Sequence, residues 1–138
     1  MSENWVKDIN DMHKRFGVHD WVKAKAAAGD VDALYEFLRF RIDFLKEELK
    51  ETDEAFKALD AEEIVDGLID LCVVAIGTLD AFGIDPYKAW NTVHDANMSK
   101  EPGVKPSRPN KLGLPDLIKP EGWIPPSHED NHGILNKL

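Results

Sequence analysis

The sequence predicts an all-α protein of four to five helices, followed by an extended, proline-rich C-terminal tail. Apolar residues in the first hundred positions recur every three or four residues, and capping residues precede these series. No period-two alternation of apolar and polar residues predicts a strand. Seven of the eight prolines lie after residue 100. We therefore expect a helical body, 1–100, and a tail, 101–138.

The first two predicted helices are short and end at glycines. One covers Glu3–Phe16 and ends at Gly17, and the next covers Asp20–Ala28 and ends at Gly29. Glycine often follows a helix directly, because it adopts the left-handed backbone conformation at little steric cost.

The long helix that follows begins after Asp30 as N-cap and extends to about Leu59. It carries two apolar stripes: Leu34, Leu38, Ile42, Leu45, Leu49, Phe56 and Leu59 form one, and Phe37, Phe40 and Phe44 form the other. Two apolar faces on one helix in so small a chain indicate that one face meets another subunit.

The remaining two helices begin with recognisable capping residues. Asp60 opens a helix through the apolar stretch that ends near residue 83, and Glu63 stands three residues later, as in a capping box. Asp85 as N-cap and Pro86 at the first helical position open the last helix, which continues to Met98.

The tail is too apolar for a simple linker. Its apolar side chains are Leu112, Leu114, Leu117, Ile118, Trp123, Ile124, Ile134 and Leu135. We therefore expect the tail to lie extended over the body or over a neighbouring subunit.

Charge and cysteine content restrict the class of protein. The net charge of −9 repels polyanions, so no nucleic-acid partner is expected. The single cysteine and a polar start without a hydrophobic leader favour the cytoplasm. Asp66, Asp70 and Asp80 interrupt the apolar stretch 64–84 and argue against a membrane span.

Acidic residues at helical spacing are the most informative feature. At about 100° per residue, one helix face carries Glu48 and Glu51 beside Glu47, and another carries Glu63, Asp66 and Asp70. A helix that is apolar all round is expected to be buried, and unpaired carboxylates there cost roughly several kcal/mol each. Two facing acidic patches predict a divalent-cation site, and Mg²⁺ prefers such oxygen ligands.

Simpler structural interpretations exist for parts of this set. Charge runs such as Glu47–Glu51 are usually solvated faces, here with Lys46 and Lys50 as neighbours. Glu63 is as well explained by a capping role as by a ligand role. Asp66 and Asp70 resist the interpretation as a solvated face, because their neighbours in sequence are apolar.

Other catalytic apparatus is absent from the sequence. The only Glu-x-x-His spacing expected of a di-iron bundle is Glu129–His132, in the tail. There is no zinc-binding spacing, phosphate-binding glycine loop or nucleophile elbow. His13, His19 and His94 stand alone, and lone histidines are more often structural than catalytic. The chemistry expected is metal-assisted attack by water.

Residues 41–51 (RIDFLKEELKE) resemble the Arg…EExxE helix of the MazG-type all-α nucleoside triphosphate pyrophosphohydrolases. This superfamily includes phosphoribosyl-ATP pyrophosphohydrolase and the dimeric dUTPases. Residues 63–74 (EIVDGLIDLCVV) match its second acidic signature, and residues 97–100 (NMSK) look like the end of its MazG-like subgroup. If Asp70 is the final acid of that signature, Gly67 stands where the family has Glu. In the other register Glu63 and Asp66 form the pair, but the interval after Glu51 is then short for the family. We therefore rank Asp70 and Asp66 above Glu63 as ligands.

The resemblance implies cleavage of a (deoxy)nucleoside triphosphate between its α- and β-phosphates, as nucleotide-pool housekeeping in a homodimer or homotetramer. It implies Mg²⁺, with Mn²⁺ as a substitute, held by Glu48, Glu51, Asp66 and Asp70, with Glu63 as a further candidate. Glu47 or Glu48 would accept a proton from water. Arg41, Asn97 and Lys100 would contact the substrate, although an ion pair explains Arg41 equally well. The alternatives are a phosphoribosyl-ATP pyrophosphohydrolase and a non-catalytic helical module that binds a nucleotide or a protein.

Overall fold

The computed structural model describes residues 2–112 and 116–138 in two compact units. The first unit holds the residues up to Pro86 together with His132–Leu138, and the second holds Tyr87–Asn131. Leu114 and Pro115 of the predicted tail lie outside the described residues. The division at residue 100 that the proline content suggests stays a prediction.

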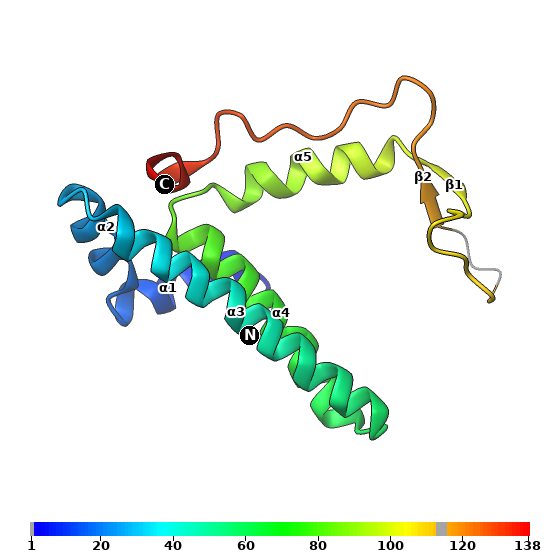
Figure 1. The fold of residues 1–138 in the computed structure, drawn as a ribbon, viewed down its shortest axis with the longest axis horizontal. Coiled ribbons are helices and arrows are strands. Elements are labelled where there is room, and N and C mark those ends of the chain that lie inside the picture. Colours follow the sequence, from blue (N-terminus) through cyan, green and yellow to red (C-terminus); the bar gives the residue numbers. More distant parts are fainter. Residues whose placement is uncertain (1, 113–115) are drawn as a thin grey trace. The chain divides into compact units, whose positions relative to one another are not determined.

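Among the described residues, five α-helices confirm the all-α prediction, and their bounds differ from the predicted ones by a few residues (Figure 1). The first unit contains α1 (Trp5–Arg15), α2 (Val18–Ala27), α3 (Val31–Lys57) and α4 (Ala61–Ala81). The fifth helix, α5 (Pro86–Met98), begins at the proline that predicted its start.

Side-chain caps fix the starts of α3 and α4. Asp30 accepts a hydrogen bond from the Ala33 amide at 3.1 Å, and Asp60 accepts one from the Glu63 amide at 3.2 Å. The predicted capping box also requires the Asp60 amide to donate to the Glu63 carboxylate. This part of the prediction is wrong, because the Asp60 amide donates to the Ala55 carbonyl at 3.0 Å instead. The Glu63 carboxylate is therefore not used as a cap.

Helices α3 and α4 form an antiparallel hairpin and lie side by side along their length (Figure 1). The turn between them places Leu59 in the left-handed region at φ 55°. This conformation ends α3 and allows the Asp60 amide to close the last turn. The Leu59 side chain is 81% exposed, so the strained residue gains little from packing.

The apolar core of the first unit surrounds the C-terminal end of α4. Ala81, Phe82 and Ile84 are buried there, and Phe37 and Leu38 of α3 pack against them. The short 3₁₀ helix η1 (Gly133–Lys137) returns to the same place, where the Ile134 amide donates to the Phe82 carbonyl at 2.8 Å. The last residues of the chain therefore complete the core of the first unit.

The N-terminal half of α4 is not buried all round, contrary to the sequence-based expectation. Val65, Leu68 and Ile69 are 62%, 52% and 44% exposed, and Asp66 is exposed beside them. The reason is that α3 covers only one face of α4 in this region. Asp66 is therefore accessible to solvent, and the argument that a buried carboxylate needs a cation does not apply to it.

The second unit combines α5 with a short antiparallel ladder of β1 (Glu101–Gly103) and β2 (Asp116–Ile118). The sequence showed no strand pattern, and three-residue strands are too short to show one. The Trp123 indole donates to the Ala96 carbonyl at 2.9 Å, which holds the chain after β2 against α5.

Within residues 2–112 and 116–138, no helix by itself has the length and apolar character needed to cross a membrane. Only α4 and α5 taken together, as a bent pair, meet that test of length and composition.

Replacing Leu59 with glycine should stabilise the first unit. Glycine adopts φ 55° without the penalty that Cβ imposes, and little burial is lost. After the extra chain entropy of unfolded glycine is subtracted, we expect a gain of about 0.5–1 kcal/mol in the free energy of unfolding, measured by urea denaturation. Leu59→Ala is the matched control and should bring no gain, because it keeps Cβ. Equal effects of the two substitutions would contradict this account.

Candidate functional site

Helices α3 and α4 approach each other closely at Thr52 and Gly67. Both residues are buried, and a Cβ added to Gly67 would overlap the Thr52 hydroxyl. That hydroxyl, which faces Gly67 of α4, donates to the Glu48 carbonyl of its own helix at 2.7 Å. Only glycine fits at this point, so the backbones of the two helices are brought together there.

Glu48 lies one turn before Thr52 on the same face of α3 and is 9% exposed. Burial raises the pKa of the Glu48 carboxyl above its ordinary value, and the negative charges of its neighbours raise it further. Among those charges Asp70 has the largest effect, and Glu51, Glu47 and Asp66 follow. The close contact of α3 and α4 thus brings five carboxylates into electrostatic range of one another: the carboxylate cluster of Glu47, Glu48, Glu51, Asp66 and Asp70.

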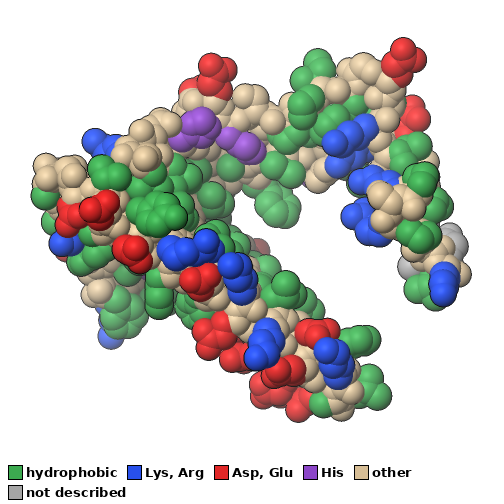
Figure 2. Space-filling view, in the orientation of Figure 1, with side chains coloured by type: hydrophobic (Ala, Val, Ile, Leu, Met, Phe, Trp, Pro, Cys, Tyr) green, Lys and Arg blue, Asp and Glu red, His purple; other side chains and the backbone are tan. Residues whose placement is uncertain are grey.

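Lysines stand near the carboxylate cluster but pair with other acids. On α3, Lys46 pairs with Asp43, Lys50 with Glu54 and Lys57 with Asp53. In the described part of the chain, no ion pair reaches any carboxylate of the cluster. Figure 2 shows acidic side chains gathered along the α3–α4 hairpin, with basic side chains between them. The exposed Glu47 and Glu51 fit the predicted solvated face, whereas the buried Glu48 does not.

The members of the cluster differ in exposure. Glu47, Glu51 and Asp66 are exposed and Asp70 is half-buried. Glu63 is exposed one turn before Asp66 or Gly67 on α4. Their exposure leaves oxygen atoms accessible to solvent, which a hydrated Mg²⁺ ion requires.

Glu47 borders a second surface of α3, away from Gly67. It lines a shallow hollow of about 290 Å³ with Phe40, Asp43 and Phe44. These four residues recur every three or four positions, so the hollow is a side of one helix rather than an enclosed pocket.

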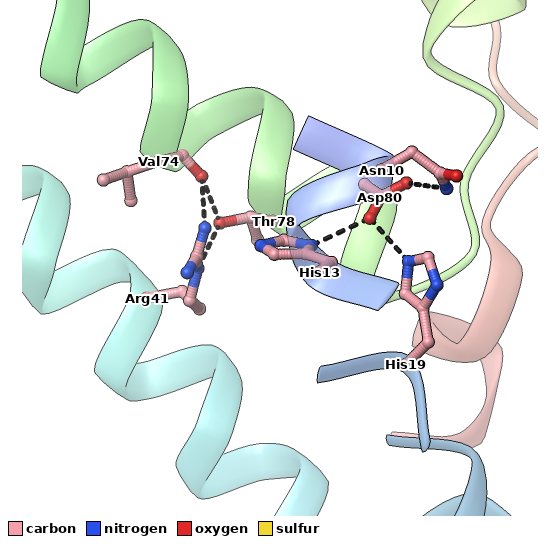
Figure 3. Close-up of polar contacts among 7 residues, drawn as sticks. All are labelled: Asn10, His13, His19, Arg41, Val74, Thr78 and Asp80. Carbon is pink, nitrogen blue, oxygen red and sulfur yellow. Dashed lines mark hydrogen bonds and ion pairs between the residues drawn. The ribbon is translucent and has the colours of Figure 1, made fainter. Parts of the chain in front are cut away.

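Arg41 is held by α4 about two helical turns from Glu48. Its Nε donates to the Thr78 hydroxyl at 3.0 Å, and its Nη2 donates to the Val74 carbonyl at 3.0 Å (Figure 3). Burial lowers the pKa of the guanidinium. These contacts fix α3 against α4, and the predicted contact of Arg41 with substrate stays a prediction.

Asn97 and Lys100 lie in the second unit and contact each other. Lys100 Nζ donates to Asn97 Oδ1 at 2.9 Å and lies 5.3 Å from the centre of the Trp123 ring. Lys119 Nζ lies 5.0 Å from the same ring. The tryptophan and the two amines form a basic, aromatic surface of the second unit, and the substrate role of Asn97 and Lys100 stays a prediction.

Two histidines that stand alone in the sequence meet in the structure. His13 Nδ1 and His19 Nε2 lie 2.8 Å and 2.6 Å from the same oxygen, Asp80 Oδ2 (Figure 3). Asn10 Nδ2 donates to the other oxygen, Asp80 Oδ1, at 2.7 Å. This meeting was not anticipated from the sequence, and the one signal for it there was an aspartate inside an apolar helix.

Burial and hydrogen bonding act in opposite directions in this group. Burial lowers the pKa of His13 and outweighs the favourable bond to Asp80. Burial would raise the pKa of Asp80, but hydrogen bonds from Asn10, His19 and His13 outweigh it and hold that pKa below its ordinary value. The lowered pKa of Asp80 favours its charged carboxylate form, which its three side-chain partners stabilise.

Comparison with known proteins matches the helical region of the chain to one protein family. The family model described as phosphoribosyl-ATP pyrophosphohydrolase matches residues 25–97, more than half of the chain. The match includes α3, α4 and every carboxylate of the cluster. No curated protein matches the chain.

Replacing Glu48 with glutamine should stabilise the protein when divalent cations are absent. A raised pKa means that Glu48 favours folding at low pH and that this contribution is lost as the pH rises through the raised pKa. In EDTA at about pH 8, Glu48→Gln should therefore melt a few degrees above the wild type, and the difference should vanish near about pH 3.5. Glu54→Gln, outside the cluster on α3, is the control for charge removal. A lower melting temperature for Glu48→Gln at about pH 8 would count against repulsion within the cluster.

Proposed function

The chain belongs to the phosphoribosyl-ATP pyrophosphohydrolase family, and on that basis we propose that its carboxylate cluster binds Mg²⁺ for the hydrolysis of a nucleotide. Membership implies a pyrophosphohydrolase that acts on a nucleotide. The proposal specifies the substrate as a (deoxy)nucleoside triphosphate cleaved between its α- and β-phosphates, which removes unwanted nucleotides from the pool.

The observation that carries the proposal is a set of carboxylates from two helices that repel one another. Glu48 is buried, its pKa is raised by four neighbouring carboxylates, and no ion pair among the described residues offsets their charge. A divalent cation removes this repulsion, and an all-oxygen donor set suits Mg²⁺, with Mn²⁺ as a substitute. The residues present therefore fit the ion.

Glu48, Glu51, Asp66 and Asp70 are the proposed ligands, with Asp70 first because its charge acts most strongly on Glu48. Glu63 is a further ligand candidate, since the structure does not use its carboxylate as a cap. When bound, Mg²⁺ supplies positive charge to phosphate oxygens.

Glu47 is the proposed proton acceptor, with Glu48 as the second candidate. Glu47 is exposed next to Glu48, and no described ion pair involves it. In the proposed step, the oxygen of a water molecule bonds to the α-phosphorus while the bond from that phosphorus to the bridging oxygen breaks. The proton of the water passes to the glutamate, and pyrophosphate leaves with the bonding electrons. The other product is the nucleoside monophosphate.

A second candidate substrate is phosphoribosyl-ATP, and the description of the matching family favours it. The same bond would break, so the carboxylate cluster serves both substrates equally. The two proposals differ in the group beyond the phosphates, and only a comparison of substrates separates them.

The apolar surface of α4 supports assembly of the protein as a homodimer or homotetramer. Val65, Leu68 and Ile69 share a face directed away from Thr52 and are all more than two-fifths exposed. On α3, Leu49 and Phe56 lie two turns apart on one face and are also exposed. A second copy that covers these faces would bury them at the end of the hairpin that carries the cluster. Because the chain is acidic and has a single cysteine, we propose that the protein is cytoplasmic and has no nucleic-acid or membrane partner.

Purified protein should convert at least one nucleotide to its monophosphate and pyrophosphate when Mg²⁺ is present. We propose a panel of ribo- and deoxynucleoside triphosphates together with phosphoribosyl-ATP, with the products separated by mass. Asp70→Asn and Glu48→Gln should lower kcat by about 100-fold or more, while Glu54→Gln should keep the wild-type rate.

Two results would overturn parts of this proposal. If the protein binds nucleotides but forms monophosphate and pyrophosphate from none of them, it is a non-catalytic module. Full activity of Asp70→Asn and Glu48→Gln would show that the chemistry lies elsewhere in the chain.

Introducing a charge at Leu68 should weaken the assembly. We expect wild-type protein to sediment as a dimer or tetramer, and Leu68→Glu to shift toward the monomer, because a buried unpaired carboxylate opposes association. Lys23→Glu, an exposed charge change on α2, is the control and should leave the mass unchanged. A wild-type monomer at all concentrations in analytical ultracentrifugation would contradict the proposed oligomer.

A further inference from the structure

Three metal-ligating side chains from three helices meet outside the carboxylate cluster: His13 of α1, His19 of α2 and Asp80 of α4. We propose that this histidine–aspartate cluster binds a Zn²⁺ ion that fastens α1 and α2 to the C-terminal end of α4. The proposal does not depend on the function proposed above.

The donor atoms already converge on one place. His13 Nδ1, His19 Nε2 and a carboxylate oxygen of Asp80 all lie within 4.8 Å of one another. In the close-up, both rings direct a nitrogen toward Asp80 Oδ2 (Figure 3). Zinc bonds of about 2.0–2.1 Å in tetrahedral geometry place donor atoms about 3.3 Å apart. The observed separations of 2.8 Å and 2.6 Å require the donors to move apart by less than an ångström.

The donor types fit zinc better than magnesium. Two imidazole nitrogens and one carboxylate oxygen are a common zinc set, whereas Mg²⁺ takes oxygen ligands. An imidazole binds a metal ion through one nitrogen and can keep a proton on the other. The fourth position would be taken by water.

Charge and burial also favour a cation. The side chains of His13 and Asp80 are 5% and 7% exposed, and that of His19 is 15% exposed. Among the described residues, no lysine or arginine forms an ion pair with Asp80. The carboxylate is therefore a buried negative charge whose partners are two imidazoles and an amide, and a divalent cation would balance it.

The residues around the cluster hold its members in place. Asn10 binds the distal oxygen of Asp80 and so orients the carboxylate with Oδ2 toward both histidines. His13 packs on Gly77, where an added Cβ would lie 3.2 Å from His13 Cε1. Outer contacts of this kind orient ligands in metal sites.

The histidine–aspartate cluster is distinct from the carboxylate cluster. Asp80 lies ten residues after Asp70 on the same helix, which corresponds to about 15 Å along the axis. The two sites can therefore be loaded with different ions and tested separately.

The test is zinc binding by the full chain after treatment with EDTA, in competition with a chromophoric chelator and with excess Mg²⁺ to occupy the carboxylate cluster. We expect one zinc ion per chain. His19→Gln and Asp80→Asn should each weaken zinc binding by about 10–100-fold or more. His94→Gln, an exposed histidine of the second unit, and Asp70→Asn, in the other cluster, should keep wild-type affinity.

A second measurement uses the wild-type protein, so that the result does not depend only on variants that could misfold. Co²⁺ added to the wild type in place of Zn²⁺ should give the visible absorption of a tetrahedral nitrogen and oxygen site, and this absorption should disappear in His19→Gln. Zinc should also raise the melting temperature of the wild type by roughly 5–10 °C at a hundredfold excess over Kd, and not that of His19→Gln.

Absence of zinc binding by the wild type would overturn the proposal. So would zinc binding that persists unchanged in both His19→Gln and Asp80→Asn, since the ion would then bind elsewhere. Loss of binding in Asp70→Asn but not in His19→Gln would assign the zinc to the carboxylate cluster and would also overturn it.

Discussion

The contact between Gly67 and Thr52 is the constraint on which the carboxylate cluster depends. Because Gly67 has no side chain, α4 packs directly on the Thr52 side chain of α3, and the acids that flank this contact on the two helices lie within electrostatic range of one another. Packing of the hairpin and repulsion of the carboxylates therefore oppose each other at one place. If the cluster binds a cation as proposed, the free energy of ion binding would include relief of that repulsion.

The lysines of α3 do not offset the negative charge of the carboxylate cluster. Lys46, Lys50 and Lys57 are close enough in sequence to offset the cluster, yet each pairs with an acid outside it. Each of these exposed ion pairs contributes little to stability, but because the lysines are paired elsewhere, none forms an ion pair with a carboxylate of the cluster. Helix α4 thus carries Asp66 and Asp70 of the carboxylate cluster near its start, and near its end Asp80, which meets His13 of α1 and His19 of α2.

Local signals in the sequence predicted the helices and the shared faces of the acids, because caps and helical period depend on neighbours a few residues apart. Asp30, Asp60 and Pro86 mark the starts of their helices in the structure as they do in the sequence. Meetings between distant residues could not be predicted in this way. Asp80 meets His13 and His19 from more than sixty residues away, and the exposure of Val65 and Leu68 depends on how little of α4 is covered by α3. Glu63 looked like a capping residue because its spacing fits, but the geometry of the Leu59 turn gives the Asp60 amide another acceptor.

The return of the C-terminus to Phe82 changes how the chain order should be understood. The chain leaves the first unit at Pro86 and re-enters it at His132, so the second unit is an insertion anchored at both ends rather than an appendage. Both anchors lie at the same end of α4, where the Ile134 amide binds the Phe82 carbonyl. The buried residues of the core, Ala81, Phe82 and Ile84, all belong to the first unit. Removing the final residues would expose Phe82, so the last residues of the chain belong structurally to the core of the first unit.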